Sequence, residues 1–227
     1  MPRTRRLAAT AVALAGLSIA AACGAGSSTT STADGATAGT AAPSGSVAGS
    51  RITPPLNMSD VTFTDFSADP NGAPFPFKAA SGKLLVTYFG YLSCPDICPT
   101  TMSDISAALQ RMAPADREKV QVAFVTIDPE RDTGAKVAGF VEHFVPDGHG
   151  LRAPDDSTLW TSTSRLGVQY KIEAHAPGSS YGVSHTGYQY VIDDQGRAVW
   201  VWPYGTPSKD LAATLTALVR GETPAVA

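Results

Sequence analysis

The chain has 227 residues, of which 17 are basic and 20 acidic, so its formal net charge at pH 7 is −3. This slight excess of acid provides no basic surface for nucleic acid, and no nucleic-acid partner is expected. Hydrophobic residues make up 43% of the chain, enough for one domain with a sizeable core. No internal repeat is visible, and a monomer is expected.

The first 22 residues have the pattern of an export signal. Three arginines precede the uncharged run Leu7–Ala22, which is short for a spanning helix and ends in small residues. Because Cys23 stands at the cleavage point, this region resembles a bacterial lipoprotein signal, although Ala20 replaces the usual leucine. Residues 1–22 are therefore predicted to be a lipoprotein signal peptide and Cys23 the lipidated residue. An ordinary signal peptide is the alternative.

Residues 24–50 consist almost entirely of Gly, Ser, Thr, Ala and Pro, and Asp34 is their only charge. Such a composition buries too little apolar surface to offset chain entropy, so residues 23–50 are predicted to be a flexible tether that starts at the lipidated cysteine. A tether of this length spans roughly 30 Å. Residues 51–227 are then a domain held by lipid on the extracytoplasmic face of the cell membrane.

Hydrophobic patterns predict the elements of this domain. In chain order they are a strand over 61–66, a hairpin or turn over 75–83, a buried strand over 84–91, a helix with apolar spacing over 102–112, a strand over 120–127, helices over 133–145 and 157–166, a hairpin of strands 189–192 and 198–202, and a helix over 208–219. This order predicts a single thioredoxin-like α/β domain, with a central mixed sheet flanked by helices.

Cys94 and Cys98 lie between the predicted buried strand and the following helix, where open α/β sheets usually place ligands. Pro99 suits the first turn of that helix, which puts Cys98 at or next to the N-cap, where the helix dipole favours a thiolate. The pair can hold a soft metal, cycle as a disulfide or staple the fold. A staple is the weakest interpretation, because so short a loop constrains the unfolded chain little.

The ligand inventory favours copper among the soft metals. An iron–sulfur cluster normally needs four cysteines and structural zinc four ligands, whereas copper(I) accepts two sulfurs with or without an imidazole. Copper(II) is the alternative oxidation state, since it could use the same three ligands with a fourth oxygen ligand in a tetragonal site. His185 precedes the predicted strand 189–192, in the loop that packs against the dithiol of a thioredoxin-like fold, and is the candidate third ligand. A hydrogen-bonded loop histidine is the alternative. His143, His149 and His175 are predicted to lie in a helix and two polar loops, as ordinary surface residues.

Charged residues flank the candidate site. Asp96 lies between the two cysteines, and it is interpreted either as a carboxylate outside the ligand shell or as a solvated loop acid. Asp128, Glu130, Arg131 and Asp132 follow the strand 120–127, and Arg131 is expected to organise their loop by bidentate pairing with one of the acids. A role of this cluster in partner docking is the alternative.

Residues 89–102 (Phe-Gly-Tyr-Leu-Ser-Cys-Pro-Asp-Ile-Cys-Pro-Thr-Thr-Met) resemble the signature of the Sco/SenC family of cytochrome c oxidase assembly proteins. Residues 126–133 and 184–193 resemble two further family segments, in the right order and at the right spacing. The resemblance implies one copper held by Cys94, Cys98 and His185. It also implies a role in building the dinuclear CuA centre of oxidase subunit II.

Three functions are compatible with these residues. The favoured one is a membrane-anchored copper chaperone that serves the CuA domain of subunit II and receives copper from a periplasmic donor. The second is a thiol–disulfide oxidoreductase, in which Cys94 and Cys98 are the catalytic dithiol and reduce the cysteines of that subunit. The third is a redox or copper sensor. Whether the protein is an enzyme depends on the second function.

Overall fold

The computed structural model of the protein describes residues 49–224. The predicted signal peptide, Cys23 and nearly all of the predicted tether lie outside the described residues. The first strand begins at Ser50, one residue before the predicted start of the domain. Across 49–224, no helix is both long enough and apolar enough to span a membrane.

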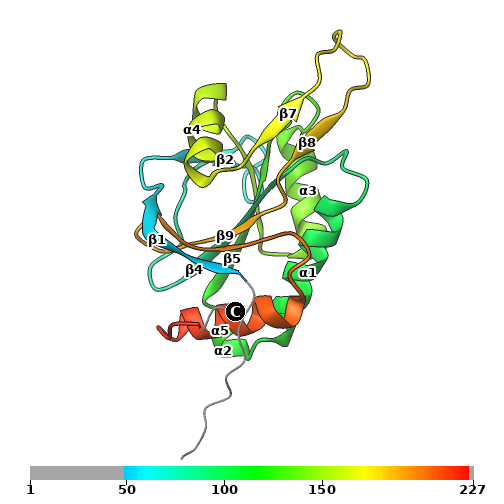
Figure 1. Ribbon diagram of the computed structural model, residues 1–227. Coiled ribbons are helices and arrows are strands. Elements are labelled where there is room, and N and C mark those ends of the chain that lie inside the picture. The colour runs from blue at the N-terminus through cyan, green and yellow to red at the C-terminus, as the bar shows by residue number, and fades with distance from the viewer. Residues whose placement is uncertain (1–48, 225–227) are drawn as a thin grey trace, which may run out of the picture. The chain divides into compact units, whose positions relative to one another are not determined.

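A mixed sheet forms the centre of the domain (Figure 1), with the strand order β1-β10-β9-β4-β5-β6-β2-β3. Its strands are β1 (Ser50–Asn57), β2 (Thr62–Asp65), β3 (Ala73–Pro76), β4 (Leu84–Gly90), β5 (Val120–Thr126), β6 (His149–Arg152), β9 (Gln189–Ile192) and β10 (Arg197–Trp202). Strands β4, β5 and β6 are parallel, and the other pairs are antiparallel. Two short strands, β7 (Tyr170–Ile172) and β8 (Val183–His185), pair only with each other. They form a hairpin that projects from the main sheet (Figure 1).

Helices cover both faces of the sheet (Figure 1). They are α1 (Ile97–Arg111), α2 (Pro114–Arg117), α3 (Gly134–Phe144), α4 (Asp156–Leu166) and α5 (Ser208–Val219). Helix α1 connects β4 to β5, and α3 connects β5 to β6. Both are crossover connections between neighbouring parallel strands, which are right-handed in nearly all proteins. Helix α1 contacts α3 and α5, and α4 lies on the other face. The buried side of α1 repeats every three or four residues: Cys98, Thr101, Met102, Ile105, Ala108 and Leu109.

The central strand β4 is buried from Leu85 to Gly90, because β5 and β9 flank it and helices cover its faces. The indole rings of Trp200 and Trp202 on β10 are fully buried, whereas Trp160 on α4 is 67% exposed. The carboxyl end of β4 is thereby fixed within the buried core of the domain. The two cysteines follow directly from this end.

The predicted mixed sheet flanked by helices is confirmed, but four strands were not predicted. β1 contains Pro54 and Pro55 and is mostly exposed, so it shows no clean alternation. β6, β7 and β8 have only three or four residues each, too few for a periodic signal. The segment 75–83 starts within β3, which pairs with β2 as an edge hairpin, and its remainder is loop.

Candidate metal centre

The cysteine loop turns the chain from β4 into α1. The backbone N–H of Cys94 donates to the carbonyl oxygen of Tyr91 (3.3 Å), and the N–H of Cys98 donates to Sγ of Cys94 (3.4 Å). Asp96 is the N-cap residue, so Cys98 lies within the first turn of α1, slightly further along than predicted. The amide at the start of the helix therefore points at the sulfur of Cys94.

The two thiols differ in their surroundings. Cys98 is fully buried, and this burial raises the pKa of its thiol from 9.0 to about 12. A helix terminus contributes about 0.3–1 kcal/mol, whereas this pKa change corresponds to about 4 kcal/mol. Burial therefore outweighs the predicted effect of the helix dipole, and the metal-free protein keeps Cys98 as a thiol. Cys94 is 8% exposed and is the sulfur nearer to solvent.

His185, at the end of β8, presents a lone pair to the sulfurs. Its Nδ1 lies 3.0 Å from the carbonyl oxygen of Thr186, which can only accept, so Nδ1 carries the proton. Nε2 is then free of hydrogen and lies 3.4 Å from Sγ of Cys98. Burial lowers the pKa of the imidazole, which favours the neutral, ligating form.

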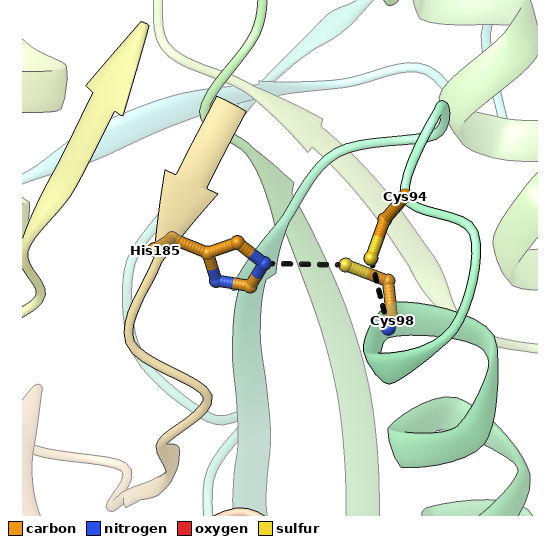
Figure 2. A group of neighbouring side chains, drawn as sticks. All are labelled: Cys94, Cys98 and His185. Atoms are coloured by element: carbon orange, nitrogen blue, oxygen red, sulfur yellow. Dashed lines mark hydrogen bonds between the residues drawn. The ribbon is translucent and has the colours of Figure 1, made fainter. Parts of the chain in front are cut away.

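Figure 2 shows the three side chains converging from the cysteine loop, the first turn of α1 and the end of β8. The sulfurs of Cys94 and Cys98 and a ring nitrogen of His185 all lie within 4.8 Å of one another. Among the described residues, no other group of three or more His, Cys, Asp or Glu side chains brings its ligand atoms close enough together to hold a metal ion. Two soft sulfurs and one imidazole suit copper(I), and the set lacks the fourth ligand of a closed zinc site.

Two neighbours of the site were missed by the sequence analysis as site residues. The hydroxyl of Tyr88 on β4 donates to Sγ of Cys98 at 3.6 Å. A Cβ atom added to Gly90 would lie 2.8 Å from the same sulfur and 2.9 Å from the ring of Phe124, so only glycine fits there. A glycine that ends a buried strand just before a dithiol is the signal that could have indicated this close approach.

The charged residues that flank the site differ in their burial and in their hydrogen bonds. Asp96 is exposed and accepts a hydrogen bond from the Thr100 hydroxyl (3.4 Å), and its action on a metal stays a prediction. Asp128 and Asp132 are buried. Arg131 donates to Asp128 through Nε alone (2.5 Å), and its Nη1 donates to the carbonyl oxygen of Tyr181 (3.0 Å). The predicted bidentate pairing is therefore wrong, although Arg131 does organise the loop.

The remaining histidines take no part in this group. His143 is exposed on α3. His149 lies on β6, where its Nδ1 is 2.7 Å from Oδ2 of Asp65, and His175 stacks on Tyr181 with 3.6 Å between ring centroids. The prediction of ordinary surface residues is thus wrong for His149 and His175, which are half-buried and make specific contacts.

Comparison with known proteins identifies the family. The sequence model described as SCO1/SenC matches residues 58–220, well over half of the chain. The chain belongs to the SCO1/SenC family. An SCO2-like protein of Rickettsia conorii is 30% identical over 132 residues, which cover 57% of this chain and 62% of that protein. The match thus spans less than two thirds of this curated relative.

Two solved structures share the fold. A Sco1 protein from Thermus thermophilus, described in its apo form, is 28% identical with a TM-score of 0.65, covering 78% of this chain and 99% of that one. ScoI from Bradyrhizobium japonicum, described with copper bound, is 32% identical with a TM-score of 0.57, covering 71% and 95%. These matches confirm the thioredoxin-like fold predicted for the family.

Proposed function

We propose that this protein is a copper chaperone that binds one copper through Cys94, Cys98 and His185. The observation that carries the proposal is the convergence of two sulfurs and one deprotonated imidazole nitrogen within 4.8 Å. A related protein of the same family, 32% identical, is described with copper bound. In this role the chain holds its cargo between the core thiol of Cys98 and the more accessible thiol of Cys94.

The resemblance to Sco/SenC proteins extends the proposal to a destination. The acceptor is the CuA domain of cytochrome c oxidase subunit II, and a periplasmic copper protein supplies the metal. A lipid on Cys23 holds the protein at the membrane on the extracytoplasmic side, and the tether lets the domain turn toward its partner. Partial exposure of Cys94 allows a partner thiolate to exchange at that sulfur first, while Cys98 and His185 keep their hold.

A second candidate function uses the same dithiol without metal. Both cysteines are free thiols, and their sulfurs are close enough to form a disulfide after a small movement. The high pKa of Cys98 makes it a poor attacking group, so Cys94 is the nucleophile in this scheme. It attacks the partner disulfide, one partner thiolate leaves, and Cys98 then displaces the second as the chain's own disulfide forms. A sensor function stays a further prediction.

One experiment separates the two candidates. Purified protein is loaded with copper(I) under reducing, anaerobic conditions, then freed of reductant and mixed with a copper-free CuA fragment whose cysteines are reduced. A chaperone binds one copper per chain and, once ferricyanide has removed one electron per dinuclear centre, produces the CuA absorption bands. In parallel, metal-free protein is mixed with the fragment in its disulfide form. Loss of that disulfide, together with no stable copper binding, would contradict the chaperone function and support dithiol exchange.

A further inference from the structure

The ligands of the candidate copper site come from two segments that are far apart in the chain. Cys94 and Cys98 follow β4, and His185 ends the separate β7–β8 hairpin. The loop of residues 128–132, after β5, contacts both segments without contributing a ligand. We call it the bridging loop.

On one side, the bridging loop holds the cysteine loop. Oδ2 of the buried Asp132 accepts hydrogen bonds from the backbone N–H of Leu92 (3.0 Å) and from the hydroxyl of Thr126 (2.6 Å). Leu92 lies two residues before Cys94. A carboxylate with two donors in a buried setting fixes both partners firmly, because breaking either bond leaves a buried charge poorly satisfied.

On the other side, the bridging loop holds the hairpin at Tyr181. The hydroxyl of Tyr181 donates to Oδ1 of the fully buried Asp128 (2.7 Å), whose Oδ2 accepts from Nε of Arg131. Nη1 of Arg131 donates to the carbonyl oxygen of Tyr181, and the guanidinium carbon lies 3.7 Å from the centre of the Tyr181 ring. Three contacts thus join the bridging loop to Tyr181, two residues before β8 begins.

A second path runs from Arg131 to the imidazole itself. Its guanidinium carbon lies 5.8 Å from the centre of the Tyr91 ring. The edge of that ring packs against His185, with 5.7 Å between centroids and 86° between planes. Arg131 is therefore connected to His185 in two ways. It contacts Tyr181, which lies four residues before His185 in the chain, and it contacts the ring of Tyr91, which packs against the imidazole.

The hairpin needs such support. β7 and β8 have three residues each and pair only with each other, and a lone two-stranded ribbon is marginal in water. Residues 176–180 at its tip are exposed. On the far side of His185 the chain enters β9 after three residues. On the near side β8 pairs with β7, and Tyr181 then ties the hairpin to the bridging loop.

We propose that Asp128, Arg131 and Tyr181 are positioning residues that set the place of His185 relative to the two sulfurs. They thereby raise the copper affinity without touching the metal. This inference rests on the proposed function. Removing the Tyr181 hydroxyl should lower the copper(I) affinity about 10–100-fold, as is typical when a group that orients a metal ligand is lost.

A double-mutant cycle tests whether Tyr181 acts through His185. Copper(I) affinity is measured by competition with a chromophoric chelator for the native protein, Tyr181→Phe, His185→Ala and the double variant. We expect the Tyr181→Phe loss of 10–100-fold in the native background and less than about twofold once His185 is absent. An equal loss in both backgrounds, or no loss in either, would overturn the proposal.

A metal-free measurement separates this proposal from the proposed function. Amide hydrogen exchange at residues 184–186 should be at least tenfold faster in Tyr181→Phe, since this variant lacks the hydroxyl that ties the hairpin to Asp128. Tyr204→Phe, the same change at an exposed tyrosine after β10, is the control and should alter neither readout. Unchanged exchange at 184–186 overturns the positioning role. Absence of copper binding by the native protein would instead refute the chaperone function.

Discussion

The two sulfurs of the site belong to the main core of the domain, whereas the imidazole belongs to a hairpin outside the main sheet. Cys98 is enclosed by β4 and α1, next to Tyr88 and Gly90. His185 is half-buried and depends on contacts to the bridging loop for its place. The dithiol is thus fixed by the fold itself, whereas His185, the proposed third ligand, is held by a few side chains that can be changed separately.

Changing a sulfur should have the largest effect. Cys98→Ser replaces a soft ligand with a hydroxyl in a fully buried place, and copper(I) binding should fall below detection in a chelator competition. Cys94→Ser should lose binding as well. Near-ultraviolet circular dichroism checks that both variants are folded, and a folded serine variant that binds copper with native affinity would refute the assigned ligands.

Removing the imidazole should separate the two halves of the site. His185→Ala should lower the copper(I) affinity by more than the 10–100-fold typical of an outer-shell change, because a direct ligand is lost. Its rate of disulfide exchange with a small disulfide should change only modestly, since the dithiol stays in the core. His143→Ala, at an exposed histidine, is the matched control and should have neither effect. A native affinity in His185→Ala would contradict the three-ligand site.

A methyl group at Gly90 tests how rigidly the core holds the sulfurs of Cys94 and Cys98. Gly90→Ala places a Cβ 2.8 Å from Sγ of Cys98, and overpacking in a core typically costs about 1–3 kcal/mol of unfolding free energy. We expect this loss in chemical denaturation and a weaker copper affinity. Gly139→Ala on α3 is the control, because a Cβ added there would meet no atom within 4 Å beyond its own helix backbone. This change should be neutral or stabilise the fold by up to about 1 kcal/mol. Equal stability changes in the two variants would show that the surroundings of Cys98 adjust to the added methyl group at little cost.

The pH dependence of copper binding should include proton release from the buried sulfur of Cys98. Because burial raises the pKa of Cys98 to about 12, this thiol is protonated at neutral pH and must release its proton when copper binds. Copper(I) affinity should therefore rise with pH, by up to about tenfold per pH unit for this proton. Calorimetry in buffers of different ionisation enthalpy counts the released protons. A count of zero at pH 7 would mean that Cys98 is already ionised.

The same pKa predicts how stability depends on pH without metal. The folded chain keeps the Cys98 proton above pH 9.0, where the unfolded thiol loses it, so this group stabilises the fold at lower pH. Its contribution should decline as pH rises from 9.0 toward about 12. The decline should be absent in Cys98→Ala, compared by urea unfolding at matched pH. The same slope in both proteins would show that other groups dominate.

The strongest hydrophobic patterns predicted the central elements. The runs over 84–91 and 120–127 correspond to β4 and β5, and the helix over 208–219 is α5 with the predicted bounds. A strand that is buried on both faces has a continuous apolar run, and a helix that is buried on one face has an apolar residue every three or four positions. Both patterns can be recognised in the sequence. The short strands β7 and β8 leave no such pattern, and the hairpin that carries His185 was therefore not predicted.

The candidate ligands of the site could be proposed from the sequence, but the residues that support them could not. Spacing and residue chemistry indicated Cys94, Cys98 and His185, and the structure places them together. The contacts of Tyr88 and Tyr181 depend on which segments meet in space, which a single sequence does not show. The net ionisation of Cys98 was not predicted for a related reason, because burial outweighs the helix terminus and depends on the whole core.

The most direct test of the account is X-ray absorption spectroscopy at the copper edge of the reduced, copper(I)-loaded protein, beside its His185→Ala variant. The account predicts one copper per chain with two sulfur neighbours and one nitrogen neighbour, and loss of that nitrogen in the variant. A copper surrounded only by nitrogen and oxygen, or a coordination unchanged by His185→Ala, would contradict it.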